Sequence, residues 1–123
     1  MTLYLHYNQI AEINGKLFQD LSNLKELWLD NNKISESNDN TFNGLAKLHG
    51  LYLNNNQIGS IKEDAFNGLS SVCRLVLNNN QIRSISDRAF NGLGNLRELR
   101  LNDNRISSIS KEGFSGLSII CNR

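Results

Sequence analysis

The chain has 123 residues, of which 39% are hydrophobic and 20% charged, and this composition is typical of one folded domain and excludes a disordered chain. Thirteen Lys and Arg residues against twelve Asp and Glu residues leave a net charge of +1, which supplies no overall field to attract nucleic acid or an anionic membrane. No apolar run approaches the ~20 residues of a membrane-spanning helix, and no segment of signal-peptide type opens the sequence, so we expect no direct membrane insertion of this segment.

A period of 24 residues runs from one end of the chain to the other. The columns without exception include two of Leu, one of Asn and one of Phe: Leu3, Leu27, Leu51, Leu75 and Leu99; Leu5, Leu29, Leu53, Leu77 and Leu101; Asn8, Asn32, Asn56, Asn80 and Asn104; Phe18, Phe42, Phe66, Phe90 and Phe114. Ile follows each Asn by two positions, from Ile10 to Ile106. A repeat of this length is one supersecondary unit that buries its apolar face only by stacking on its neighbours, so the period predicts a solenoid.

We expect one domain of five repeats over residues 1–119, namely 1–23, 24–47, 48–71, 72–95 and 96–119, with residues 120–123 opening a truncated sixth repeat. The sequence contains no terminal repeat with a polar outer face, which a solenoid needs to keep its core from water. We therefore expect a fragment of a larger protein with limited solubility.

The letters of each repeat resemble the leucine-rich repeat pattern L-x-x-L-x-L-x-x-N-x-I. The 24-residue period and segments such as Ala65-Phe66-Asn67-Gly68-Leu69 are similar to the typical extracellular subfamily, found in Slit, peroxidasin, Toll-type receptors and variable lymphocyte receptors. The resemblance implies an α/β leucine-rich repeat fold, a right-handed horseshoe solenoid with a concave parallel β-sheet and a convex side of short helical turns and loops. It also implies an extracellular or cell-surface location.

Each repeat begins with an alternating stretch such as Leu27-Trp28-Leu29, which predicts a strand with Leu inward and Trp28 outward. The Asn that follows each strand lies where the chain turns, and its amide can donate to and accept from the turn backbone, which predicts a ladder of Asn side chains. The Phe column lies on the far side of each coil, where stacked rings fill the core.

The convex segments contain no Pro and carry Asn-Gly pairs at Asn43-Gly44, Asn67-Gly68 and Asn91-Gly92, which predict turns and loops rather than long helices. One column, Ile13, Ile61, Ile85 and Ile109, is interrupted in the second repeat by Ser37, where we expect a looser loop.

The outward positions of the sheet are the candidate binding surface, because packing does not fix their identity. The strand-centre column is Tyr4, Trp28, Tyr52, Val76 and Arg100, and further bases flank it at Arg74 and Arg97. Trp, Tyr and Arg are the residue types that most often anchor protein interfaces. The predicted partner-binding residues are therefore Tyr4, Trp28, Tyr52, Arg74, Arg97 and Arg100, although β propensity alone also accounts for aromatic residues here.

Catalytic and metal-binding patterns are absent from the sequence. His6 and His49 are expected ~19 Å apart, too far for one metal ion, and we predict no cofactor. His49, Cys73 and Arg97 share one column, so one interpretation of Cys73 is a reactive thiol whose thiolate is favoured by two neighbouring cations; an exposed cysteine of ordinary chemistry is the favoured interpretation. Cys121 is expected ~9.6 Å from Cys73, which excludes an internal disulfide.

These patterns favour a protein-binding recognition module, not an enzyme, that uses its concave face to bind a protein or peptide and belongs to an extracellular adhesion, matrix or immune-type receptor. Two alternatives stay open: structural spacer repeats of a larger receptor or matrix enzyme, and an intracellular scaffold. Nucleic acid is not an expected partner.

Overall fold

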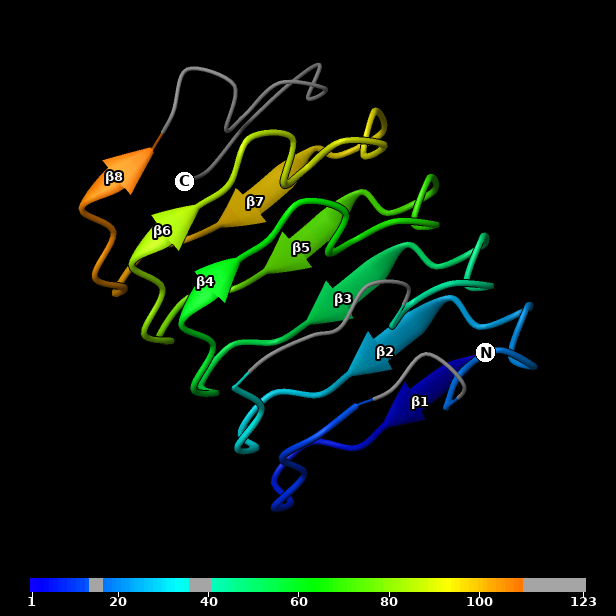
Figure 1. The fold of residues 1–123 in the computed structure, drawn as a ribbon. Helices are drawn as coiled ribbons and strands as arrows, with labels where there is room; N and C mark the ends of the chain where they lie inside the picture. Colours follow the sequence, from blue (N-terminus) through cyan, green and yellow to red (C-terminus); the bar gives the residue numbers. More distant parts are fainter. Residues whose placement is uncertain (14–16, 36–40, 110–123) are drawn as a thin grey trace.

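The computed structural model describes residues 1–13, 17–35 and 41–109, and these form a solenoid of stacked coils (Figure 1). One strand of each coil contributes to a five-stranded parallel sheet in the order β1, β2, β3, β5, β7. These strands are β1 (Thr2–Tyr4), β2 (Glu26–Trp28), β3 (Gly50–Tyr52), β5 (Arg74–Val76) and β7 (Glu98–Arg100). This is the predicted leucine-rich repeat architecture with its parallel sheet.

The register of the sheet follows the sequence period, because each strand residue pairs with the residue 24 positions later, as in Leu3 with Leu27 and Leu27 with Leu51. The inward Leu at the centre of β2, β3, β5 and β7 is 0% exposed in each case. Side chains alternate between the two faces of a strand, so the residue after each inward Leu points outward. All members of the column Tyr4, Trp28, Tyr52, Val76 and Arg100 therefore lie on one face of the sheet.

Asparagine side chains connect successive coils where the strands end. Asn56 is typical: its Nδ2 donates to the carbonyl oxygens of Leu29 (3.0 Å) and Leu53 (3.1 Å), and its Oδ1 accepts from the backbone N–H of Ile34 (3.0 Å). The same bonds recur at Asn32, Asn80 and Asn104. The ladder supplies partners to buried backbone groups that the short strands leave unpaired.

Phenylalanine rings stack beneath the convex side. The ring centroids of Phe18 and Phe42 are 6.4 Å apart, those of Phe42 and Phe66 6.3 Å, and those of Phe66 and Phe90 6.1 Å, with interplanar angles of 18° or less. All four rings are buried. Phe114, predicted to continue this column, lies outside the described residues.

The convex segments are single turns, and the described residues contain no helix. In each turn the N–H of a residue donates to the carbonyl oxygen three positions earlier, as from Leu45 to Phe42 and from Leu69 to Phe66. Gly44, Gly68 and Gly92 have φ values of 94°, 92° and 90°, a left-handed conformation that favours glycine and accounts for the Asn-Gly pairs.

A second sheet was not predicted from the sequence. It is parallel and three-stranded, in the order β4 (Ser60–Ile61), β6 (Ser84–Ile85) and β8 (Ser108–Ile109). Three members of the Ile13 column therefore lie in strands of their own. The loop expected at Ser37 lies outside the described residues.

Candidate binding face

The outward side chains of the five-stranded sheet form a connected path across all five strands, and we call this surface the concave face. The path consists of Tyr4 on β1, Trp28 on β2, Tyr52 on β3, Arg74 on β5, and Glu98 and Arg100 on β7. Five of these six residues were predicted as partner-binding positions, and the structure brings them together on one face. Glu98, which connects the two arginines, was not among them.

Aromatic rings occupy the first three strands. The ring centroids of Tyr4 and Trp28 lie 5.9 Å apart, and those of Trp28 and Tyr52 only 3.7 Å apart at an interplanar angle of 11°. The indole N–H of Trp28 donates to the Oε1 of Glu26 at 3.2 Å. This bond and the stack on Tyr52 hold the orientation of Trp28, while Tyr4 remains 61% exposed.

Tyr52 differs from the outward, accessible side chain that the sequence suggested, because it is only 7% exposed. Trp28 covers one side of its ring, and the ring also lies over Gly50, where an added Cβ would come within 3.1 Å of the Cε2 and hydroxyl oxygen of Tyr52. Its hydroxyl accepts a hydrogen bond from the Nη1 of Arg74 at 3.4 Å. The buried Tyr52 thus contacts both Trp28, through the ring stack, and Arg74, through the hydrogen bond.

Glu98 connects the charged side chains of the last two strands. Its Oε1 lies 3.4 Å from the Nε of Arg74, and its Oε2 accepts a hydrogen bond from the Nε of Arg100. The bond from Arg100 is the largest cause of a lowered pKa for Glu98, and the charges of Arg100 and Arg74 act in the same direction. The hydrogen bond to Tyr52 is the main cause of a raised pKa for Arg74. Both shifts favour the charged forms of Arg74 and Glu98 at neutral pH.

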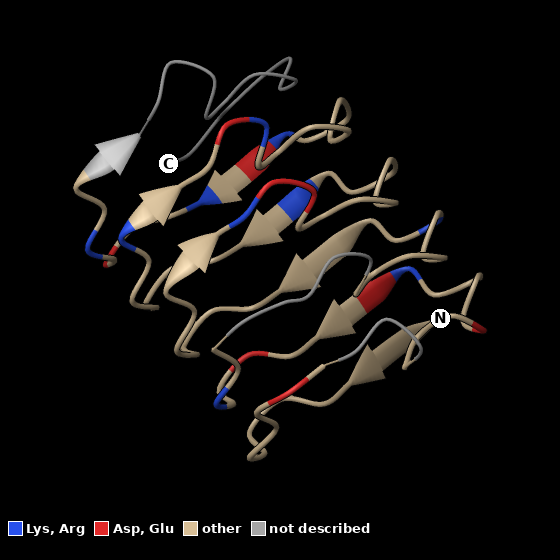
Figure 2. Ribbon diagram, in the orientation of Figure 1, with Lys and Arg blue, Asp and Glu red and all other residues tan. Residues whose placement is uncertain are grey.

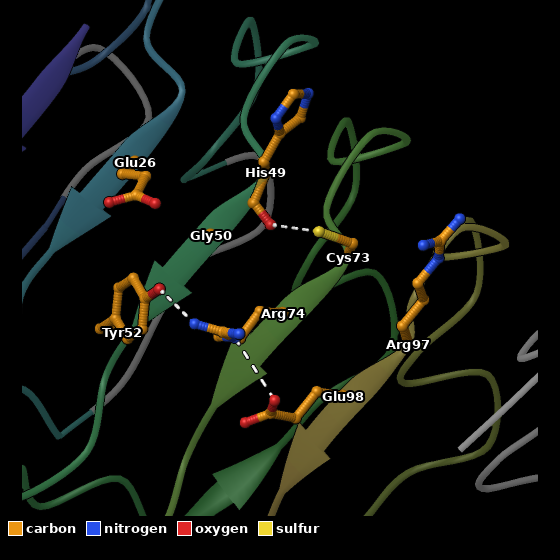
Figure 3. Close-up of a pocket in the computed structure, with 8 residues that line it drawn as sticks. All are labelled: Glu26, His49, Gly50, Tyr52, Cys73, Arg74, Arg97 and Glu98. Carbon is orange, nitrogen blue, oxygen red and sulfur yellow. Dashed lines mark hydrogen bonds and ion pairs between the residues drawn. The ribbon is translucent and has the colours of Figure 1, made fainter. Parts of the chain in front are cut away.

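Two depressions flank this path. One, of about 420 Å³, is lined by Glu26, His49, Gly50, Tyr52, Cys73, Arg74, Arg97 and Glu98 (Figure 3). The other, of about 360 Å³, is lined by Trp28, Tyr52, Asn54, Arg74, Val76, Asn78, Glu98 and Arg100. Tyr52, Arg74 and Glu98 line both, so they form the ridge between the depressions.

His49, Cys73 and Arg97 lie at the edge of the sheet where its strands begin. In Figure 3 the His49 and Arg97 side chains point away from Tyr52, Arg74 and Glu98. The Sγ of Cys73 donates to the backbone oxygen of His49 at 3.5 Å, so its nearest polar partner is a carbonyl group and not a base. This geometry gives no support to an activated thiol, and Cys73 is a free, half-buried cysteine. Cys121 lies outside the described residues.

A cluster of rings around His6 was missed at the sequence level. The His6 ring centroid lies 5.6 Å from Tyr4, 5.4 Å from Tyr7 and 6.4 Å from Trp28. Tyr7 is 74% exposed and has a φ of 56°, in a column where the other four members are Asn or Asp. Those residues favour the left-handed conformation, so the presence of a tyrosine there was the available signal.

The described residues offer neither a metal site nor a membrane-spanning helix. Among residues 1–13, 17–35 and 41–109, no three His, Cys, Asp or Glu side chains gather closely enough to hold a metal ion. The described part of the chain also has no helix of the length and hydropathy required to cross a membrane.

Comparison with known proteins identifies the fold. A family model described as leucine rich repeat matches residues 1–58, 47–106 and 74–120. The chain belongs to the leucine-rich repeat family. The leucine-rich repeat domain of APL1B has a similar crystal structure, with a TM-score of 0.84 and 23% identity over 98% of this chain and 38% of that one. At this identity the likeness shows the fold alone, and no curated protein matches the chain.

Leucine-rich repeat domains are typical protein-interaction modules and are generally not enzymes. Their solenoids present an extended surface made of many short strands, and recognition is a property of the side chains on that surface rather than of the fold. The concave face is one such extended surface of this chain.

Proposed function

We propose that the chain is a recognition module whose concave face binds a protein or peptide partner. The observation that carries the proposal is the connected path from Tyr4 to Arg100, which crosses all five strands and is exposed at both ends. Five strands span about 19 Å, a width that suits a loop or an edge of a partner protein better than a small molecule. Tyr and Trp side chains lose little rotamer entropy for the area they bury, and Arg is enriched with them at the centres of protein interfaces.

The side chains of the path have two roles in the proposed binding, contact with the partner and positioning of the contact residues. Tyr4, Trp28 and Arg100 present surface for contact, whereas the 7% exposed Tyr52 holds Trp28 and Arg74 in place. Pre-organisation of this kind lowers the entropy cost of association, because the contact side chains are already ordered before the partner arrives. Arg97 adds positive charge at the edge of the face.

We further propose that the protein acts outside the cell or at its surface, as part of an adhesion, matrix or immune-type receptor. The support is the resemblance of the 24-residue repeats to the typical extracellular subfamily. The ligand class is a protein, and neither a cofactor nor nucleic acid enters the proposal.

A binding screen of the chain against secreted and cell-surface ectodomains tests the proposal. Tyr4→Ala and Arg100→Ala are the contact variants, and Lys62→Ala, an exposed residue just after β4, is the matched control. We expect at least one partner whose affinity falls by more than ~2 kcal/mol in the double contact variant and is unchanged in the control. A partner insensitive to the double variant would place recognition elsewhere, and no partner at all would favour the spacer alternative.

A further inference from the structure

The balance of acidic and basic side chains on the concave face changes along the stacking direction of the coils. We call the part on β1 to β3 the aromatic half and the part on β5 and β7 the arginine half. On the outward positions of β1 to β3 and the position two residues beyond each strand, Glu26 and Asp30 are the charged residues, so this half has two carboxylates and neither Lys nor Arg, with His6 as its one imidazole. The same positions of β5 and β7 carry Arg74, Arg100 and Glu98, two bases against one carboxylate. In Figure 2, β2 carries a red segment, β5 a blue segment, and β7 both a red and a blue segment.

Charges next to these positions do not remove the difference. Lys25 and Arg97 each lie one residue before a strand, one in each half, and so leave the contrast unchanged. Asp103, in the turn beyond β7, adds a carboxylate to the arginine half. That half still has three bases, Arg74, Arg97 and Arg100, against two carboxylates, whereas the aromatic half has Lys25 against Glu26 and Asp30. The field across the face therefore runs from negative at the aromatic half to positive at the arginine half.

Among the described residues, neither carboxylate of the aromatic half forms an ion pair with a basic side chain. The only side-chain donor to Glu26 there is the neutral indole of Trp28. The Oδ2 of Asp30 accepts from the Asn31 amide at 2.7 Å, while its Oδ1 is buried without a partner. Unbalanced negative charge beside exposed Tyr4 and half-exposed Trp28 favours a cation over their rings, where cation–π attraction and the carboxylates act in the same direction.

The arginine half has the opposite preference. Glu98 bonds the Nε atoms of both Arg74 and Arg100, which fixes the two guanidinium groups on either side of one carboxylate. Their side chains are still 53% and 47% exposed, and the contacts described for them leave the Nη atoms of Arg100 and the Nη2 of Arg74 free. A guanidinium group oriented in this way binds a carboxylate through paired N–H donors.

From this arrangement we propose that the partner of the concave face is an extended segment with a Lys or Arg over the aromatic half and an Asp or Glu over the arginine half. The inference rests on the proposed function, and it adds the chemistry and direction of the ligand. From β2 to β7 there are three strand spacings, about 14 Å, which an extended chain covers in about four residues. A basic and an acidic residue four positions apart therefore match the two halves.

Three acetylated and amidated peptides test the inference: Arg-Ser-Gly-Ser-Glu, Arg-Ser-Gly-Ser-Arg and Glu-Ser-Gly-Ser-Glu. Trp28 is the only tryptophan of the chain, so its fluorescence reports binding at the junction of the two halves. At ~50 mM salt we expect the mixed-charge peptide to bind about 5-fold more tightly than either uniform peptide, and the difference to vanish near ~0.5 M salt. Equal affinities of the three peptides at low salt, or no binding by the mixed peptide, would overturn the inference.

Variants with altered charge test which half of the concave face binds which charge of the peptide. Arg100→Glu is expected to make the doubly basic peptide the tightest ligand, whereas Lys62→Glu, the same change of charge away from the concave face, keeps the original order. Because Arg100→Glu also removes a bond to Glu98, Glu26→Gln provides a second variant, in which the preference for the mixed over the doubly acidic peptide falls by at least about 2-fold. An unchanged order in both variants would refute the assignment of the halves.

Failure of this inference is distinguishable from failure of the proposed function. A partner that is lost in the Tyr4→Ala, Arg100→Ala double variant, combined with peptides that show no charge order, would refute the polarity alone. A partner indifferent to that double variant would refute both.

Discussion

Removal of one amide from the Asn ladder provides the sharpest test of how this solenoid is held together. In the Asn56→Ala variant, the backbone N–H of Ile34 loses the Oδ1 that it bonds at 3.0 Å, in a buried setting. The carbonyl oxygens of Leu29 and Leu53 each keep a second donor, because Asn32 also donates to Leu29 and Asn80 to Leu53. Asn56 also donates to the carbonyl oxygen of Asn54, which still accepts from the N–H of Asn31. One buried N–H is thus left without a partner, and the three carbonyl groups each keep one.

The expected cost follows from that inventory. An unpaired buried N–H costs about 1 to 3 kcal/mol, and the lost bonds to the carbonyl groups add about 1 kcal/mol, so Asn56→Ala should lower the free energy of unfolding by about 2 to 4 kcal/mol. Asn8→Ala is the matched control, because Asn8 is exposed and its described bonds are donations to Leu5 and His6, in its own repeat. We expect a loss below about 1 kcal/mol there.

Urea unfolding followed by circular dichroism measures both values, with the midpoint and slope of each transition fitted separately. Similar losses for Asn56→Ala and Asn8→Ala would refute the reasoning, since the two sites differ in burial and in the inter-coil bond. A loss below about 1 kcal/mol for Asn56→Ala would mean that water replaces the amide at little cost.

Two further predictions concern the concave face. Gly50→Ala should displace the Tyr52 ring, whose atoms would lie 3.1 Å from the new Cβ, and change the near-ultraviolet circular dichroism of the stacked aromatic residues; Gly59→Ala, with nothing within 4 Å of the added Cβ, should leave it unchanged. The pKa of Glu98 is lowered chiefly by Arg100, so its contribution to stability is complete above the ordinary pKa of 4.5 and is lost as the pH falls through the lower folded-state value. Unfolding measured from pH 6 to pH 2 should therefore decline less steeply in Glu98→Gln, and identical pH profiles would contradict the ion-pair assignment.

The predicted fold followed closely from the sequence because every repeat packs against its neighbours through the same set of side chains. Inward Leu, the turn Asn and the convex Phe recur with one period, so a single repeat determines where the others lie. The second sheet escaped prediction because two-residue strands such as Ser60–Ile61 are too short to leave an alternating pattern.

The candidate site was predicted by position but not by side-chain role. Counting outward positions placed Tyr4, Trp28, Tyr52 and Arg100 on one face, since strand alternation is local geometry. The count of outward positions did not predict that Tyr52 would be covered. The burial of Tyr52 depends on the ring of Trp28 in the neighbouring strand β2 and on the absence of a side chain at Gly50 in its own strand β3.

The sequence by itself determined the solenoid, its register, its core columns and which side chains point outward from the sheet, since a strict period leaves only one way to bury the Leu and Phe side chains. Only the tertiary structure decided which outward residues are accessible and how their charges combine. Glu98 illustrates the reason: it contacts Arg74 24 residues earlier and Arg100 two residues later, so its role emerges only when successive coils bring three side chains together.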